Sequence, residues 1–162
     1  MSPAETLAWA SAIEASALSV TLKQSALLYP LVNVGHVIGI AVIAGAIAAL
    51  DLRLLGFARS IPVEAAERFL RGIVLAGLII AVPTGVLLFV PDAITLSQSA
   101  TFLVKLLLVA LGLANAALFI LLWRGRMGKW NTNPPLAGRV QAVASLMIWF
   151  GAVSAGRLIA YW

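Results

Sequence analysis

A few polar side chains lie inside long apolar stretches of this sequence, and they are the residues best suited to chemistry. His36 is the only histidine, and it lies within 26 consecutive residues (25–50) that contain no acidic residue, lysine or arginine. Lys105 and Arg157 occupy two further apolar stretches. Imidazole is a standard axial ligand of haem iron, and ionisable groups inside membrane-spanning segments are costly and often functional. These three residues are therefore the first candidates for a site.

Helix geometry predicts that the three candidates share one depth in a membrane. At a rise of 1.5 Å per residue, His36 and Lys105 lie about 9 and 6 Å from the start of their helices, and Arg157 lies about 7 Å from the end of its helix. Asn33 lies three residues before His36 on a neighbouring helix face, and Asp92 lies at the rim. We expect this layer to bind an anion, a carboxylate or haem propionates.

A plainer interpretation of the same residues stays open. Lys105 and Arg157 would then extend to the headgroups with their aliphatic stems in lipid, and His36 would hydrogen-bond to the backbone of a neighbouring helix. Asn115, near the centre of its helix, is a further ligand candidate, but it is also the kind of residue that forms hydrogen bonds between helices in lipid.

The cofactor that best matches His36 is haem b. One histidine cannot supply two axial ligands within one chain, so a haem would need five-coordination or His36 from two copies of the chain. Met147 belongs to the opposite half of the membrane. Soft metals require cysteine or clustered methionine, whereas the chain has no cysteine and three methionines. The sequence therefore predicts no metal site.

Composition requires these residues to be placed in a membrane. The chain has 162 residues, of which 62% are hydrophobic and 10% charged, and its mean hydropathy is +1.05. A soluble domain is about half apolar and about a quarter charged, so a soluble fold could not hide this apolar surface. The net charge of +5 is not gathered into a basic run or a basic-aromatic cluster, so nucleic acid is not expected as a partner.

Four apolar stretches predict an all-α, polytopic transmembrane four-helix bundle, with spans at about 28–55, 68–90, 101–123 and 138–160. Residues 1–24 precede this domain. Ser2-Pro3-Ala4-Glu5 forms a capping-box signature, and residues 2–20 are expected to form one amphipathic helix on the membrane surface. Residues 92–100 are expected to be a polar loop, and Pro83 is expected to kink the second span.

Small residues recur at four-residue spacing on the first two spans, at Gly35, Gly39, Gly45, Gly77 and Ala81 among others. In lipid such faces let helices approach closely. They predict either packing within one bundle or assembly into a homo-oligomer.

The distribution of cations predicts the orientation. Eight of the 11 lysines and arginines lie in segments 53–71 and 124–139, which join the first span to the second and the third to the fourth. By the positive-inside rule these loops are cytoplasmic and both termini are extracytoplasmic.

Three segments resemble a known family. They are His36-x-x-Gly39 running into residues 50–56, Phe102-x-x-Lys105 followed by Asn115, and residues 149–151 leading to 156–161. Together they resemble small bacterial four-helix membrane proteins known only as a domain of unknown function. More distantly they are similar to the membrane domain of copper-resistance D proteins and to other cytochrome-b-like bundles. The resemblance implies four spans in a bacterial inner membrane and brings no established activity.

No enzyme motif accompanies the four spans. The sequence shows no paired carboxylates at membrane depth, no phosphate-binding loop and no zinc spacing, and Asp51 with Arg53 is interpreted as an interfacial anchor. The leading hypothesis is therefore a non-enzymatic binding or accessory component of the inner membrane, with its polar pocket in the outer leaflet. A cytochrome-b-like haem or quinone redox protein and a small transporter are the alternatives.

Overall fold

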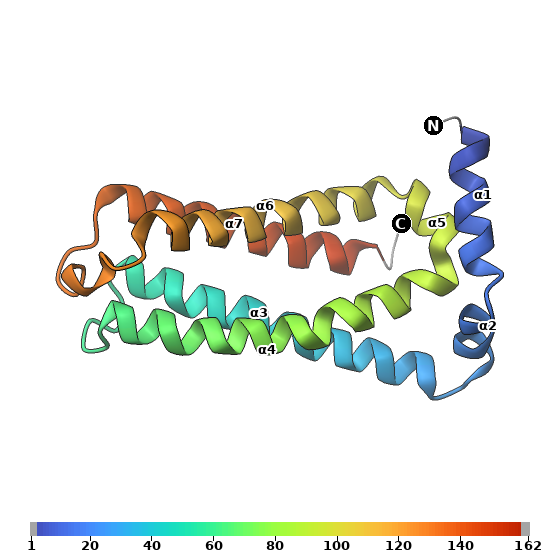
Figure 1. Cartoon of the computed structure of the whole chain (residues 1–162), viewed down its shortest axis with the longest axis horizontal. Coiled ribbons are helices and arrows are strands. Elements are labelled where there is room, and N and C mark those ends of the chain that lie inside the picture. Colours follow the sequence, from blue (N-terminus) through green and yellow to red (C-terminus); the bar gives the residue numbers. More distant parts are fainter. Residues whose placement is uncertain (1–2, 160–162) are drawn as a thin grey trace.

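Four long helices lie side by side in the computed structural model, which describes residues 3–159 and the side chains of 8–159 (Figure 1). They are α3 (Leu28–Leu54), α4 (Val63–Phe89), α6 (Ala100–Trp123) and α7 (Leu136–Leu158). Each belongs to a helical segment long and apolar enough to cross a membrane. The described part of the chain contains no strand. The expectation of an all-helical protein with four long apolar helices is confirmed.

The long helices form two hairpins, α3 with α4 and α6 with α7, which meet mainly along α3 and α7 (Figure 1). Segment 92–100, expected to be a loop, is instead helical. It contains the end of the 3₁₀ helix η1 (Val90–Asp92) and the short helix α5 (Ala93–Gln98). The Ser99 hydroxyl then caps α6 by accepting a hydrogen bond from the Phe102 N–H. The polar composition of this segment therefore reflects helix capping, as at Ser99, and not an open loop.

Small residues let the backbones of α3 and α4 approach closely. A Cβ atom added at Gly39 would lie 2.9 Å from the Ala81 backbone nitrogen, and one added at Gly77 would lie 2.7 Å from Ile43 Cγ1. A Cβ atom added at Gly45 would meet no other atom within 4 Å. Part of the small-residue pattern is thus used for packing within the chain. α4 continues through Pro83 and bends beyond its midpoint (Figure 1).

The second hairpin uses a glycine to accommodate an indole ring. A Cβ atom at Gly112 on α6 would lie 2.9 Å from Trp149 Cε2 on α7. Trp149 is therefore held flush against the α6 backbone.

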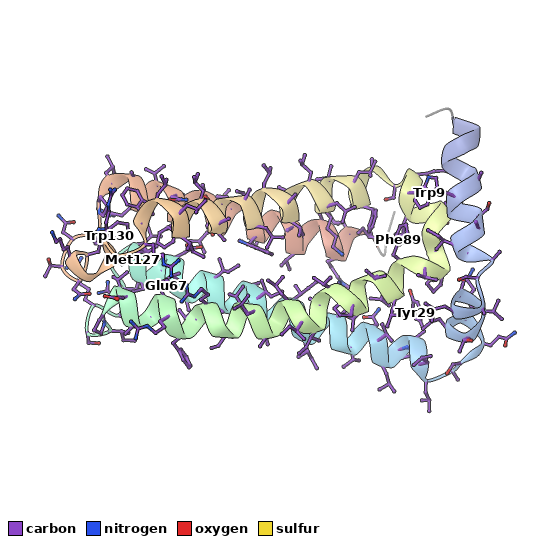
Figure 2. The ribbon with its side chains drawn as sticks, in the orientation of Figure 1. Trp9, Tyr29, Glu67, Phe89, Met127 and Trp130 are labelled. Carbon is purple, nitrogen blue, oxygen red and sulfur yellow. The ribbon has the colours of Figure 1, made fainter. Side chains whose placement is uncertain are left out.

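One end of the long helices carries both basic loops, 55–62 and 124–135, and is called the basic-loop end below. A compact core forms there, with Met127 and Trp130 at the tip of the second hairpin (Figure 2). Its buried members are Leu54, Val63, Phe119, Met127, Trp130 and Ala142. The Asn131 side-chain oxygen accepts a hydrogen bond of 3.0 Å from the Val63 N–H, so the tip of one hairpin caps the first turn of α4 in the other.

Two short helices, α1 (Pro3–Glu14) and α2 (Ala17–Gln24), lie across the opposite end (Figure 1). The single helix expected over 2–20 is therefore wrong: the chain breaks at Ser16, whose hydroxyl caps α2 by accepting from the Ser19 N–H. Apolar and polar residues are poorly segregated in α1 and better segregated in α2. The capping role expected of Ser2 falls outside the described residues.

Aromatic rings and one carboxylate fix these short helices. Trp9 stacks on Phe89 with ring centroids 6.2 Å apart (Figure 2), and Phe89 stacks on Phe102. The Glu14 carboxylate accepts hydrogen bonds from Lys23 Nζ at 2.9 Å and from the Ile94 N–H at 3.1 Å. α1 is thus attached both to α2 and to the first turn of α5.

Candidate functional site

His36 points from α3 to the backbone of α4. Its Nδ1 lies 2.9 Å from the Ala81 carbonyl oxygen and 3.1 Å from Thr84 Oγ1. A carbonyl oxygen only accepts, so Nδ1 carries the hydrogen. The Thr84 hydroxyl donates in turn to the Ile80 carbonyl at 2.6 Å. His36 therefore makes the hydrogen bond to a neighbouring helix that the plainer interpretation of the sequence described.

The other residues of the expected outer layer lie in different settings. Asn33 is exposed on α3, Arg157 is exposed and engaged near the end of α7, and Lys105 is half-buried. The Lys105 side chain packs 3.5 Å from the Cβ position of Gly156 and is close enough for its charge to act on His36. Asp92 accepts a hydrogen bond from the Tyr29 hydroxyl. A common pocket of His36, Lys105, Asn33 and Arg157 stays a prediction.

The surroundings of His36 do not fit a haem. A Cβ atom at Gly85 would lie 2.9 Å from His36 Cε1 and 3.8 Å from Nε2. The Nδ1–Cε1–Nε2 edge of the ring therefore faces the α4 backbone, and Gly85 makes room for an imidazole there. Nδ1 is engaged by the Ala81 carbonyl, so only Nε2 would be left for an iron, and it lies 3.8 Å from the Cβ position of Gly85.

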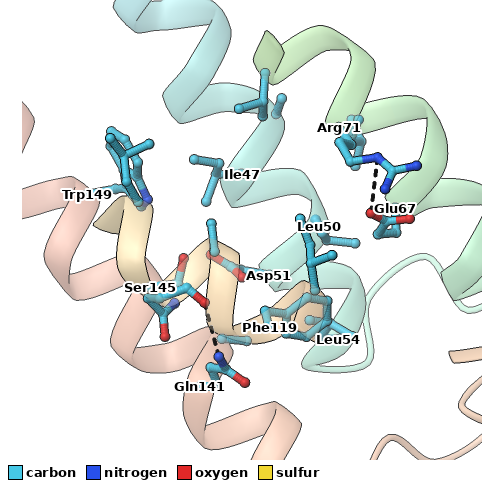
Figure 3. Close-up of a pocket in the computed structure, with 18 residues that line it drawn as sticks. Ile47, Leu50, Asp51, Leu54, Glu67, Arg71, Phe119, Gln141, Ser145 and Trp149 are labelled. Carbon is cyan, nitrogen blue, oxygen red and sulfur yellow. Dashed lines mark hydrogen bonds and ion pairs between the residues drawn. The ribbon is translucent and has the colours of Figure 1, made fainter. Parts of the chain in front are cut away.

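A cavity of about 110 Å³ lies instead between the two hairpins, in the half of the molecule nearest the basic-loop end (Figure 3). All four long helices line it, and most of its wall is aliphatic. Its polar or aromatic lining residues are Asp51, Glu67, Arg71, Asn115, Phe119, Gln141, Ser145 and Trp149. We call this space the Asp51 cavity.

Asp51 is buried in the wall of this cavity, with 6% of its surface exposed. The Ser145 hydroxyl of α7 lies within hydrogen-bonding reach of the Asp51 carboxyl group. The second carboxyl oxygen, Oδ2, has no hydrogen-bond partner among the described residues. Asp51 lies about 5 Å along α3 from its end at Leu54. The interpretation of Asp51 as an interfacial anchor is therefore wrong, because its side chain faces the interior.

The nearest cations do not neutralise Asp51. Arg53 is 3% exposed, but its guanidinium is directed at the loops and donates to the carbonyls of Ile61 and Asn131 at 2.6 and 3.0 Å. On the α4 side of the cavity, Arg71 Nε lies 3.5 Å from Glu67 Oε1 (Figure 3). Each arginine is thus committed to another acceptor.

Trp149 contributes a second polar group without a partner. Its Nε1 is buried and has no acceptor in the part of the chain that the structure describes, and the residue is 9% exposed. Trp149 comes from α7, as does Ser145 (Figure 3). Two residues of the cavity wall thus each hold a buried polar atom without a partner among the described residues, and Trp149 Nε1 lies 3.1 Å from the Cβ position of Gly112 on α6.

Gln141, another polar residue of the wall, is hydrogen-bonded through both atoms of its amide. Gln141 Nε2 donates to the Asn115 backbone carbonyl at 3.1 Å, and Gln141 Oε1 accepts from Trp123 Nε1 at 2.9 Å. Asn115 was expected to join helices through its side-chain amide. In this hydrogen bond it joins α6 to α7 through its backbone carbonyl. No group of three or more His, Cys, Asp or Glu within residues 3–159 is placed to hold a metal ion.

No protein-family model, curated protein or solved structure matches this chain. The resemblance stated from the sequence stays untested, and the assignment of a site depends on the geometry. The sequence did contain a sign of the Asp51 cavity: Asp51 lies four residues after Ile47 and three before Leu54, so it shares a helix face with residues that line the interior.

Proposed function

We propose that this protein is a multi-pass protein of a bacterial inner membrane that acts as a non-enzymatic binding or accessory component, with the Asp51 cavity as its ligand site. Both termini would be extracytoplasmic, which places the basic-loop end and the cavity on the cytoplasmic side. The proposal moves the expected pocket from the outer to the inner half of the membrane.

One observation carries the proposal: the four long helices leave a space of about 110 Å³ between them, and the buried residue Asp51 is part of its wall. Buried polar groups in proteins are nearly always hydrogen-bonded, and each buried group left without a partner costs about 1–3 kcal/mol. Asp51 Oδ2 and Trp149 Nε1 are two such groups, and their residues belong to the wall of a space of about 110 Å³ that a small molecule would fill.

The arrangement favours binding over catalysis. Ser145 and Asp51 are neighbours, but a serine nucleophile also needs a base such as histidine. The single histidine, His36, lies 15 residues before Asp51, which corresponds to about 22 Å along α3. Acyl transfer by a serine triad is therefore unsupported.

Orientation is tested by labelling single cysteines, which the cysteine-free chain allows without background. Ser60→Cys lies in the first basic loop, and Thr95→Cys lies in α5 at the opposite end; both positions are exposed. An impermeant maleimide added to intact spheroplasts should label Thr95→Cys and leave Ser60→Cys unlabelled until the membrane is opened. The reverse pattern would place the basic loops outside and overturn the orientation.

Ligand binding is tested by mass spectrometry of small molecules extracted from the purified protein. A compound present in the wild type should be absent from Asp51→Asn and retained in Glu64→Gln, a matched change of an exposed carboxylate on α4. Absence of any specific compound, together with no binding of added small molecules, would contradict a ligand site. A visible spectrum of the same sample checks the redox alternative, because a Soret band lost in His36→Ala would favour haem.

A further inference from the structure

We propose that the Asp51 cavity holds a segment of a phospholipid acyl chain, which enters sideways between α4 and α6 from the leaflet at the basic-loop end. The inference rests on the proposed function, because it names the occupant of the same cavity. It is drawn from the side on which the cavity opens, from its depth in the membrane and from the chemistry of its wall.

The cavity opens between α4 and α6. α3 packs against α4 and α7, and α6 packs against α7, but α4 and α6 are not closely packed on each other in the part of the chain that the structure describes. Among the lining residues, Arg71 of α4 and Leu113 of α6 are exposed. Ala46 of α3 and Ala142 of α7 also line the cavity, and they are no more than 5% exposed. We call Ala46 and Ala142 the back wall. The open side faces the surroundings of the bundle.

In the proposed membrane position, this opening lies at the depth of lipid acyl chains. The lining residues of α4, from Glu67 to Val74, lie about 6–16 Å from the start of the helix, and those of α6, from Leu113 to Ile120, lie about 5–15 Å from its end. A bilayer has a hydrocarbon core of about 30 Å within a total thickness of about 40–45 Å. The headgroups therefore occupy about 5–7.5 Å on each side, and most of the opening meets hydrocarbon.

The wall of the cavity suits hydrocarbon as well. Most of it is aliphatic, and Phe119 and Trp149 add aromatic rings. The polar groups of Gln141 are bonded to other residues, and Arg71 pairs with Glu67 (Figure 3). An apolar cavity of about 150 Å³ stays dry and binds benzene, and the Asp51 cavity has a similar volume of about 110 Å³. We therefore expect methylene groups in it in preference to water.

A phospholipid chain is the hydrocarbon that reaches this opening first, because phospholipids surround the bundle. An empty space leaves the atoms of its wall without van der Waals partners on one side, and a chain that enters supplies them. A volume of about 110 Å³ holds only part of one chain. The headgroup therefore stays at the membrane surface while one chain bends in between α4 and α6.

The experiment is photolabelling in nanodiscs of phosphatidylglycerol that include a small share of the same lipid with a diazirine in one acyl chain. After irradiation, peptide mass spectrometry identifies the labelled residues. Surrounding lipid labels outward-facing residues such as Leu121 and Phe150 whether or not a chain enters the cavity. The decisive positions are those of the back wall, where we expect label as well. Label confined to outward-facing residues would overturn the inference.

Two adjacent alanines of α6 provide matched variants. Ala116 lines the cavity and is half-buried, whereas Ala117 is exposed and does not line it. The larger side chain of Ala116→Leu fills the space, so this variant should lose the label on the back wall, and Ala117→Leu should keep it. Unchanged labelling in Ala116→Leu would contradict entry of a chain. Circular dichroism and a melting curve show whether each variant folds. If Ala116→Leu does not fold, the positions labelled in the wild type still decide the matter.

Further outcomes separate this inference from the proposed function. Loss of the back-wall label on addition of an isoprenoid quinone to the nanodisc would assign the cavity to a quinone tail and overturn the assignment to a phospholipid. If the back wall stays unlabelled but another compound co-purifies and is lost in Asp51→Asn, the acyl-chain inference fails and the ligand site stands. If the back wall stays unlabelled and no specific compound co-purifies or binds, both fail.

Discussion

The Arg53 guanidinium donates a 3.0 Å hydrogen bond to the backbone carbonyl of Asn131, a residue 78 positions later in the chain. The same side chain donates to the Ile61 carbonyl at 2.6 Å. A single buried arginine thus joins the loop that follows α3 to the loop that precedes α7. The basic-loop end is closed by these bonds as well as by its apolar core.

Replacing Arg53 should therefore destabilise the protein. Arg53→Met takes the donor away from the carbonyls of Ile61 and Asn131, and hydrogen bonds to charged groups contribute about 1.5–3 kcal/mol each. We expect the free energy of unfolding in mixed micelles to fall by about 2 kcal/mol or more. Arg59→Gln, which removes an exposed hydrogen bond in the same loop, is the control and should change it by about 0.5 kcal/mol or less. Equal effects of the two changes would contradict a special role for Arg53.

The contact between α3 and α4 should depend on Gly39. The added methyl of Gly39→Ala meets the Ala81 backbone, so the two helices must separate, and overpacking of this kind costs about 1–3 kcal/mol. Gly45→Ala is a matched control on the same helix, because its new methyl meets open space. Equilibrium unfolding should show a lower free energy of unfolding for Gly39→Ala and an unchanged value for Gly45→Ala. A neutral Gly39→Ala would show that the helices are further apart than described.

The hydrogen bond between His36 and α4 should make a modest contribution to stability. His36→Phe and Thr84→Val each remove part of the arrangement around the Ala81 carbonyl. Hydrogen bonds between helices in lipid contribute about 0.6 kcal/mol on average, so each change should cost about that much. A double-mutant cycle should give a coupling energy of similar size, since the two side chains contact each other. Zero coupling would show that they act separately.

The attachment of α1 to α2 and α5, at the end of the molecule opposite the basic-loop end, should weaken in acid. Hydrogen bonds from Lys23 and then from the Ile94 N–H hold the pKa of Glu14 below its ordinary value. The stabilisation is therefore fully present above the unfolded-state pKa of about 4.3 and is lost as the pH falls through the lower folded-state value. Limited proteolysis of the segment around residues 15–16 should accelerate below about pH 4. Glu14→Gln should be cleaved faster at neutral pH and show little further pH dependence.

Helix positions were predictable because apolar runs bounded by charge and proline determine them locally. The expected span over 28–55 corresponds to α3, and the close packing at Gly39 follows the small-residue pattern. Two local features, the break at Ser16 and the segment at 92–100, were predicted wrongly for one reason. Both contain residues that suit loops as well as helix caps. Contacts distant in sequence, such as that of Glu14 with Ile94, decide between a loop and a capped helix.

The Asp51 cavity was missed for a different reason, although Asp51 shares a helix face with Ile47 and Leu54. Asp51 lies next to Leu52-Arg53 near the end of a span, where an acidic residue ordinarily faces the headgroups. Two relationships accompany its interior direction: Arg53 donates to carbonyls of the loops, and Ser145 arrives from α7. Neither relationship is local in sequence. His36 was the more conspicuous residue, yet its hydrogen bonds are made to the backbone and a hydroxyl of α4.

The bonds from Arg53 are one of two links between the hairpins at their ends. The hairpins meet mainly along α3 and α7, and α3 extends about 40 Å over its 27 residues. At the basic-loop end Arg53 joins the two loops, and at the opposite end Phe89 of α4 stacks on Phe102 of α6. The two hairpins are thus clasped at both ends, by hydrogen bonds at one and by aromatic rings at the other.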